Sequence, residues 1–336
     1  MKIGEIRQNK VTKQWVIYAP SRRKRPHDFK PFKSKLHVPT HDEKCPFCTG
    51  NEYMLTKIIM EIKNPQKQWQ VRVVPNKFPA LTPITPKSNL NRFSRGIYVV
   101  MNGYGHHEIV IETPIHNRPL AKMSVEEVGN IIETYHRRYI DLMKENENMM
   151  IIIFKNHGLR AGTSLVHPHS QIIATGMVPH HIRWREEEAQ RYFDEWGRCV
   201  YCDILEYELK DTKRIIYENK SFVIFVPFAA DVPFETWIMP KNHKADFGDI
   251  SDEEKTDLTK ALHNILKKLN RKLQDPDYNY VINTSARYRA REPQLHWYIQ
   301  IIPRLMSVAG FEIGSGCSIN ISIPEEDANF LKTPTP

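Results

Sequence analysis

The chain has 336 residues, of which 40% are hydrophobic and 26% charged, a composition typical of a soluble globular protein with one large or two smaller domains. The formal net charge of +9 suits polyanionic ligands and does not distinguish nucleotides from nucleic acids. No apolar run approaches the roughly 18 residues that a membrane helix needs, and MKIGEIRQNK at 1–10 lacks the apolar region of a signal peptide. We therefore expect a cytoplasmic protein without a membrane partner.

A basic cluster and two cysteine pairs are the first distinctive segments along the chain. SRRKRP at 21–26 predicts either a solvated loop or a phosphate site. Cys45 and Cys48 form the pair CPFC, and Cys199 and Cys202 form the pair CVYC. In a cytoplasmic chain, such pairs indicate metal or redox chemistry before structural disulfides. Neither pair lies in the strand–helix pattern of a thioredoxin-like redox site, so metal binding is favoured.

The order of segments in the first half recurs in the second half. Each half contains a cysteine pair, strands, a Pro-His corner, a helix opened by an S-x-x-E capping box, a further strand, and a final strand that carries a histidine. Equivalent residues lie 127 to 129 positions apart: His116 and His243, Ser124 and Ser251, His167 and His296, Gln171 and Gln300. This agreement indicates an internal duplication.

The repeated order predicts an α+β fold made of two duplicated units, each a mostly antiparallel sheet with one main helix, related by pseudo-twofold symmetry. We expect a catalytic N-terminal half at 1–176 and a C-terminal half at 199–336. The stretch at 177–198 is charged and prone to form a helix, so it predicts a connector.

The duplication supplies two sets of metal ligands. The first set is Cys45, Cys48, His116 and His167, and the second is Cys199, Cys202, His243 and His296. Each set offers two cysteines and two histidines, which is typical of a closed, structural zinc site without an open coordination position. We therefore expect two structural Zn²⁺ ions.

One histidine has no counterpart in the second half. His169 lies two residues after His167 in HPHSQ, and the equivalent position in HWYIQ is Tyr298. A residue present in only one copy of a duplicated scaffold is a candidate for catalysis. The preceding loop, NHGLRAGTS, contains glycines and a serine that can bring N–H groups and a hydroxyl close to a phosphate.

The segment NHGLRAGTSLVHPHSQ resembles the active-site segment of galactose-1-phosphate uridylyltransferases, a branch of the histidine-triad superfamily. The family's pattern falls on Asn156, Gly158, Gly162, Ser164, His167, Pro168, His169 and Gln171. VTKQWVIYAPSRRKRP resembles the N-terminal segment, whose phosphate-binding arginines match Arg22 and Arg25. VVPNKFPAL resembles the nucleotide-binding segment and matches Asn76, and GFEIGSG resembles the late sugar-binding segment and matches Glu312.

The resemblance implies two histidine-triad-like halves and a transfer in two displacements. His169 would attack the α-phosphorus of a nucleoside-diphospho-sugar, sugar 1-phosphate would leave, and a second sugar 1-phosphate would take the nucleotide. Gln171 and Ser164 would assist at the phosphates. The residues implied in substrate binding are Arg22, Arg25, Asn76, Asn156, Gly162 and Glu312. The family also implies a homodimer.

Some residues depart from the pattern of the uridylyltransferases. Lys155 stands where many of them carry Glu, and no lysine lies near Glu312. These features resemble the branch that includes ADP-glucose phosphorylase, in which AMP is transferred and phosphate can be the acceptor. Galactose-1-phosphate uridylyltransferase activity with UDP-glucose is the first expectation, and ADP-glucose phosphorylase-like adenylyl transfer is the alternative. A simple histidine-triad hydrolase, with water as acceptor, is another.

A zinc-stabilised nucleic-acid-binding module is the alternative from a different class. The spacing between the cysteine pairs and the histidines is far longer than in zinc fingers. There is also no basic stripe with interleaved aromatic residues. We therefore expect no nucleic-acid partner.

Overall fold

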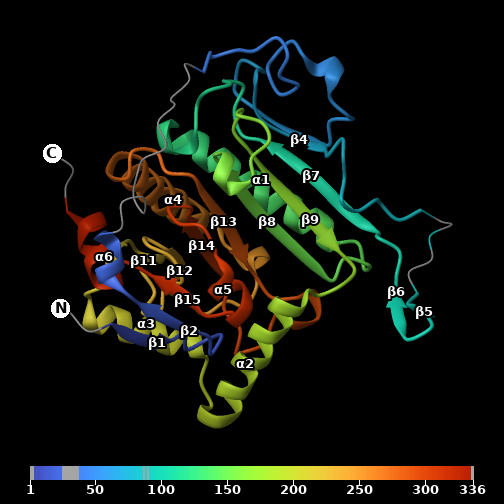
Figure 1. The fold of residues 1–336 in the computed structure, drawn as a ribbon. Coiled ribbons are helices and arrows are strands. Elements are labelled where there is room, and N and C mark those ends of the chain that lie inside the picture. The colour runs from blue at the N-terminus through green and yellow to red at the C-terminus, as the bar shows by residue number, and fades with distance from the viewer. Residues whose placement is uncertain (1–3, 25–37, 86–87, 89–90, 334–336) are drawn as a thin grey trace.

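One antiparallel sheet of ten strands forms the centre of the computed structural model (Figure 1), which describes residues 4–24, 38–85, 88 and 91–333. The order of the strands across the sheet is β10-β11-β12-β14-β13-β8-β9-β7-β4-β3. Their bounds are β3 (Met60–Lys63), β4 (Trp69–Pro75), β7 (Gly105–Ile111), β8 (Met150–His157), β9 (His169–Thr175), β10 (Ile215–Glu218), β11 (Phe222–Phe225), β12 (Thr236–Pro240), β13 (Tyr278–Asn283) and β14 (Tyr298–Pro303).

The two halves of this sheet have the same topology. From its outer edge inward, the first half runs β3-β4-β7-β9-β8 and the second runs β10-β11-β12-β14-β13. The halves meet where β8 pairs antiparallel with β13, with Asn156 opposite Asn279. This arrangement confirms the predicted α+β fold of two duplicated units. The units share one continuous sheet, because each contributes its innermost strand to the junction.

One long helix in each half covers the same face of the sheet. α1 (Val125–Met143) follows β7 and α4 (Asp252–Lys272) follows β12, and the two helices pack against each other (Figure 1). Both begin at the predicted capping boxes. The side chains of Ser124 and Ser251 accept hydrogen bonds from the backbone N–H of the third helical residue, which is Glu127 in α1 and Glu254 in α4. The side chains of these two glutamates in turn accept the backbone N–H groups of the serines. Each N-cap contributes about 1 kcal/mol to stability.

The alternation of side chains along β7 and β9 separates the core from the site. Ile172 and Ala174 pack with the residues of α1, whereas Ile109 and Ile111 pack with Cys45 and Cys48 on the opposite face. In the register of these strands, His169 lies opposite Ile111 and Gln171 lies opposite Ile109. His169 and Gln171 therefore belong to the face that α1 leaves free, because strand residues two apart share a face.

The remaining elements surround this framework. They are β1 (Glu5–Gln8), β2 (Trp15–Tyr18) and β15 (Ser318–Asn320) in a small sheet, the hairpin of β5 (Phe93–Arg95) and β6 (Tyr98–Val100), and the helices α2 (His180–Trp196), α3 (Val200–Asp211), α5 (Gly310–Ser315) and α6 (Pro324–Lys332). α2 spans most of the predicted connector. Among the described residues, no helix combines the length and apolar character needed to cross a bilayer.

The N-terminal strands pack on the second half of the chain. β2 pairs in parallel with β15, Arg7 forms an ion pair with Glu325 at 3.1 Å, and the hydroxyl of Tyr18 donates to the carbonyl oxygen of Ala230 at 2.9 Å. The predicted limits of the two halves stay a prediction.

Candidate active site

The first predicted metal set comes together in a buried cluster. The ligand atoms of Cys45, Cys48, His116 and His167 all lie within 4.8 Å of one another. His116 Nδ1 is 3.4 Å from the sulfur of Cys48, and His167 Nδ1 is 3.6 Å from both sulfurs. Bond lengths of about 2.3 Å to sulfur and 2.0–2.1 Å to nitrogen place such atoms about 3.5 Å apart around a tetrahedral ion. The four groups could therefore hold one metal ion.

The protonation of His167 supports this geometry. Its Nε2 lies 2.7 Å from the carbonyl oxygen of Thr113, to which it can only donate, so Nδ1 is left unprotonated towards the sulfurs. Burial lowers the pKa of His167 to about 4 and raises the pKa of the Cys45 thiol to about 11. A neutral imidazole is ready to coordinate, while a buried thiolate needs a cation beside it.

The second set is only partly assembled. Cys199, Cys202 and His243 form a cluster within 4.8 Å, and the sulfur of Cys202 is 3.2 Å from His243 Nδ1. The ring centroids of His243 and His296 lie 5.4 Å apart, which is close to the 5.2 Å between the ring centroids of His116 and His167. His296 Nδ1 instead donates to the carbonyl oxygen of Trp297 at 3.0 Å, and its buried Nε2 has no hydrogen-bond partner among the described residues. His296 as the fourth ligand stays a prediction.

His169 begins β9 and is buried, with 6% of its surface exposed. Its Nδ1 donates to the carbonyl oxygen of His167 at 2.9 Å, which leaves Nε2 unprotonated and available as a nucleophile. Burial lowers the pKa of His169, which favours the neutral ring. The edge of the Phe47 ring packs against the imidazole at 5.4 Å between centroids. The chain therefore presents a neutral imidazole in a single tautomer.

A buried ion pair lies beneath His169. Lys155 on β8 donates to the carboxylate of Glu112 at 2.5 Å and to the carbonyl oxygen of His169 at 3.0 Å. Lys155 and Glu112 are each 1% exposed, and the hydroxyl of Tyr135 donates to the other carboxylate oxygen at 3.3 Å. Burial lowers the pKa of Lys155. The pair holds the backbone of His169 from below, a role that the sequence pattern did not indicate.

The glycine-rich loop after β8 is held by the second half of the chain. Gly158 has a φ of +86°, and a Cβ there would lie 2.0 Å from a carboxylate oxygen of Asp277. The same side chain accepts the backbone N–H of Arg160 at 2.7 Å. Asn279 donates to Asn156 Oδ1 at 2.7 Å and to the carbonyl oxygen of Ala161 at 2.9 Å. Asp277 and Asn279 support the loop, although nothing in their local sequence indicates this function.

Gln171 and Asn76 meet at a third residue, His107 of β7. His107 Nε2 is 2.7 Å from Gln171 Oε1 and 3.1 Å from Asn76 Nδ2. Its Nδ1 accepts the backbone N–H of Ala80 at 3.0 Å. His107 was not predicted as a site residue, because only the pairing of β7 with β9 brings it beside Gln171.

The other predicted residues are less constrained. Gly162 and Ser164 are exposed in the loop, and Gly162 adopts a φ of +88°. Arg22 is half-buried in the 3-10 helix Pro20–Lys24, whereas Arg25 lies outside the described residues. Glu312 accepts the backbone N–H of Ala309 at 3.1 Å at the start of α5. The roles of all these residues stay predictions.

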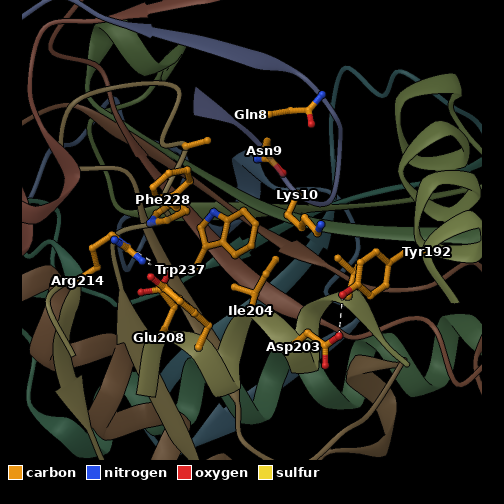
Figure 2. Close-up of a pocket in the computed structure, with 14 residues that line it drawn as sticks. Gln8, Asn9, Lys10, Tyr192, Asp203, Ile204, Glu208, Arg214, Phe228 and Trp237 are labelled. Carbon is orange, nitrogen blue, oxygen red and sulfur yellow. Dashed lines mark hydrogen bonds and ion pairs between the residues drawn. The ribbon is translucent and has the colours of Figure 1, made fainter. Parts of the chain in front are cut away.

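A separate cavity of about 390 Å³ lies between the N-terminal residues Gln8, Asn9 and Lys10 and the second half of the chain (Figure 2). Ile204, Phe228 and Trp237 are among its apolar lining residues, and two of its charged residues, Arg214 and Glu208, form an ion pair at 3.0 Å. None of its lining residues belongs to the predicted site. The residues around His169 are therefore the centre of the candidate active site.

Comparison with known proteins identifies the family. A sequence profile of the galactose-1-phosphate uridyl transferase N-terminal domain matches residues 2–179, and the profile of its C-terminal domain matches residues 185–315. The chain belongs to the galactose-1-phosphate uridylyltransferase family. ADP-glucose phosphorylase from Arabidopsis thaliana is 37% identical over 98% of this chain and 92% of its own length. Galactose-1-phosphate uridylyltransferase from Thermotoga maritima is 28% identical over 98% of both chains.

Solved structures agree with this family. The crystal structure of ADP-glucose phosphorylase from Arabidopsis thaliana with bound ADP-glucose has a TM-score of 0.85 at 34% identity, with 99% of both chains covered. A uridylyltransferase structure has a TM-score of 0.74 at 26% identity and covers 98% of this chain and 97% of its own. The resemblance to both branches of the family is confirmed, and the chain is an enzyme of a nucleotidyltransferase family.

Loss of Lys155 is predicted to destabilise the fold and the site together. Lys155→Met leaves Glu112 buried without a cation, and breaking a buried pair in this way costs about 3–5 kcal/mol of stability. The measurement is the urea midpoint of unfolding. Lys155→Met combined with Glu112→Leu should recover most of the loss. Lys144→Met is the matched control, because its ion pair with Asp141 is exposed. An unchanged midpoint in Lys155→Met would contradict a supporting role for the pair.

Proposed function

We propose that the protein transfers a nucleoside monophosphate from a nucleoside-diphospho-sugar to a second phosphate compound through a covalent nucleotidyl-histidine intermediate on His169. The observation that carries this proposal is the tautomer of His169: Nδ1–H is bonded to the backbone, and Nε2 of the buried, neutral ring has no hydrogen-bond partner among the residues that the structure describes. A neutral imidazole is a competent nucleophile near pH 7. Gln171 lies two residues later on the same face of β9.

The first displacement requires no external acid or base. Nε2 of His169 forms a bond to the α-phosphorus while the bond from that phosphorus to the bridging oxygen breaks, and sugar 1-phosphate leaves as an anion. The proton on Nδ1 stays on the ring, bonded to the carbonyl oxygen of His167. In the second displacement, a phosphate oxygen of the acceptor attacks the same phosphorus and the imidazole leaves.

The surrounding groups are assigned to the charge on the phosphates. Gln171 can donate to a phosphoryl oxygen where negative charge builds up. Ser164 and the N–H groups of the glycine-rich loop can bind the departing β-phosphate. Arg22 and Arg25 would neutralise the diphosphate through charge-assisted hydrogen bonds. Asn76, Asn156, Gly162 and Glu312 complete the proposed substrate contacts.

We infer that AMP is the transferred group, with ADP-glucose as donor and phosphate as acceptor. Identity to the Arabidopsis ADP-glucose phosphorylase is 37%, against 28% to the Thermotoga uridylyltransferase, and the corresponding TM-scores with solved structures are 0.85 and 0.74. Lys155, in place of the glutamate common in uridylyltransferases, agrees with this choice. Uridylyl transfer from UDP-glucose to galactose 1-phosphate is the second candidate, favoured by the family profiles.

Zn²⁺ is the proposed ion for both Cys/His sets, because two thiolates and two imidazoles are the ligands it prefers in closed structural sites. Such an ion supplies structural stability and leaves no open coordination position. In the first site, the ring of His167 belongs to the ligand set, and its backbone carbonyl accepts from His169. The residues that hold the ion would therefore also fix the tautomer of the nucleophile.

The adduct on His169 is the decisive prediction. Incubation with ADP-glucose alone should raise the intact mass by one AMP, because the first half-reaction needs no acceptor. With UDP-glucose, a gain of one UMP would identify the second candidate. His169→Ala should form no adduct and should keep its metal, since His169 is not a ligand in this scheme. An active preparation without an adduct, or an active His169→Ala variant, would rule out the two displacements.

Metal content is predicted to be two zinc ions per chain. Cys45→Ser should lose one equivalent and unfold at a lower temperature, because the remaining ligands cannot close a tetrahedral site. Elemental analysis of protein purified without chelator measures the content. Cys317→Ser is the matched control and should keep both ions, since Cys317 lies in neither cluster of the described residues. A metal-free wild-type protein would contradict both sites, and a single equivalent would contradict one.

A homodimer is also proposed. The β5–β6 hairpin projects from the body of the chain (Figure 1), and it exposes 90% of Ile97, 69% of Tyr98 and 70% of Val99. Apolar side chains gathered at such a tip are typical of an interaction surface. Light scattering should give twice the chain mass of 39.5 kDa. Ile97→Ser with Val99→Ser should shift the mass towards one chain, and a monomeric wild-type protein would refute this proposal.

A further inference from the structure

The hydrogen bonds of His107 define which of its nitrogens carries the proton. Nδ1 lies 3.0 Å from the backbone nitrogen of Ala80, which can only donate, so Nδ1 is the acceptor. In the neutral ring the proton then lies on Nε2, which faces Gln171 Oε1 at 2.7 Å. Asn76 Oδ1 already accepts from the backbone N–H of Phe78 at 2.9 Å, so Asn76 presents its NH₂ group to His107 and cannot accept. The Nε2–H of His107 therefore donates to Gln171.

This bond orients the amide of Gln171. Because Oε1 is held by His107, the NH₂ group of Gln171 points away from β7. Among the described residues, no side chain or carbonyl accepts a hydrogen bond from that NH₂ group. Its two hydrogens are left for a ligand on the face of the sheet that also carries His169.

The second half contains an equivalent glutamine, Gln300, whose side-chain amide has the opposite orientation. Gln171 lies opposite Ile109 in the pairing of β7 with β9, and Gln300 lies opposite Trp237 in the pairing of β12 with β14. The residue two positions before the opposing residue is His107 in the first half and Glu235 in the second.

Glu235 reverses the hydrogen bond that His107 makes. Gln300 Nε2 donates to Glu235 Oε1 at 2.8 Å, so the NH₂ group of Gln300 is already used within the protein. Gln171 and Gln300 thus lie at equivalent positions of the two halves, with their amide groups in opposite orientations. The difference arises from the neighbour on the adjacent strand, because an imidazole N–H donates and a carboxyl oxygen accepts.

We propose that His107 is the positioning residue that sets the polarity of Gln171, so that an N–H group and not an oxygen faces the phosphoryl group transferred at His169. This proposal rests on the proposed function. Phosphoryl oxygens only accept hydrogen bonds, so a reversed amide would place oxygen against oxygen where negative charge builds up. His107 touches neither the nucleophile nor the reacting phosphorus in this scheme, and it acts through Gln171.

A double-mutant cycle tests the coupling between the two side chains. The measured quantity is the single-turnover rate of adduct formation with ADP-glucose, or with UDP-glucose if that donor forms the adduct. Gln171→Leu should lower the rate about 100- to 1,000-fold, as for other lost transition-state donors. His107→Leu should lower it about 10- to 100-fold. In the Gln171→Leu background, His107→Leu should lower the rate of adduct formation little further, because the amide that His107 orients is already absent. If the double variant loses as much rate as the product of the two single losses, the side chains act independently and the proposal is overturned.

A polarity swap tests the mechanism more directly. His107→Glu introduces the residue type that Glu235 provides in the second half. Its carboxylate should accept a hydrogen bond from the NH₂ group of Gln171, so the rate should fall as far as in Gln171→Leu. His107→Gln can still donate to Gln171 and should recover part of the rate. The losses should appear in kcat more than in KM, because the contact is made mainly in the transition state. Equal rates for His107→Glu and His107→Gln would overturn the proposal.

The controls separate this inference from folding and from the proposed function. His106→Leu changes the neighbouring histidine, which pairs with Glu145 at 2.7 Å, and it should keep the wild-type rate. Melting temperature and metal content should be unchanged in all His107 variants that are compared. If wild-type protein forms no adduct, the proposed function fails. If wild-type protein forms the adduct but the rate losses of His107→Leu and Gln171→Leu multiply in the double variant, only the proposed role of His107 is refuted.

Discussion

The pairing of β8 with β13 is the constraint on which the site depends. It joins the two halves into one sheet and places Asn279 opposite Asn156. From this position, Asn279 and Asp277 bind the loop that follows β8 and hold Gly158 in a conformation that other residues rarely adopt. The second half therefore contributes to a site whose proposed nucleophile belongs to the first, because Asp277 and Asn279 bond to the backbone of the loop.

Backbone carbonyls control the chemistry of the two histidines in HPHSQ. Thr113 fixes the ring of His167, and the carbonyl of His167 fixes the ring of His169. The two rings thus have opposite tautomers: His167 offers Nδ1 to the cysteine sulfurs, and His169 keeps Nε2 for the substrate in the proposed reaction. Below them, the buried pair of Lys155 and Glu112 holds the carbonyl of His169. The ligand set of His167 and the ring of His169 are thus connected through the carbonyl of His167.

The second half carries different side chains and partners at the equivalent positions of the same scaffold. Tyr298 stands at the position equivalent to His169, and Arg185 of α2 bonds to Asn283, the counterpart of Asn156, at 2.6 Å. Its guanidinium also lies 3.5 Å from the hydroxyl of Tyr298, and Glu235 takes the NH₂ group of Gln300. A buried cation and a carboxyl group thus bond the side chains of Asn283 and Gln300, whereas in the first half Asn156 bonds to Asn279 and Gln171 bonds to His107. The halves therefore differ in the partners of their polar groups more than in their strands.

The sequence by itself determined the duplication, the two capping boxes, the grouping of Cys45 and Cys48 with two histidines and of Cys199 and Cys202 with His243, and the singular position of His169. Capping and strand alternation are local, and a constant offset between halves can be counted along the chain. Only the tertiary structure decided the contacts of His107, Lys155 and Asn279, whose partners lie 64, 43 and 123 residues away in the chain. The orientation of an amide or the pairing of a buried charge depends on which side chain the adjacent strand brings beside it. Strand register defines that neighbour, and no local pattern records it.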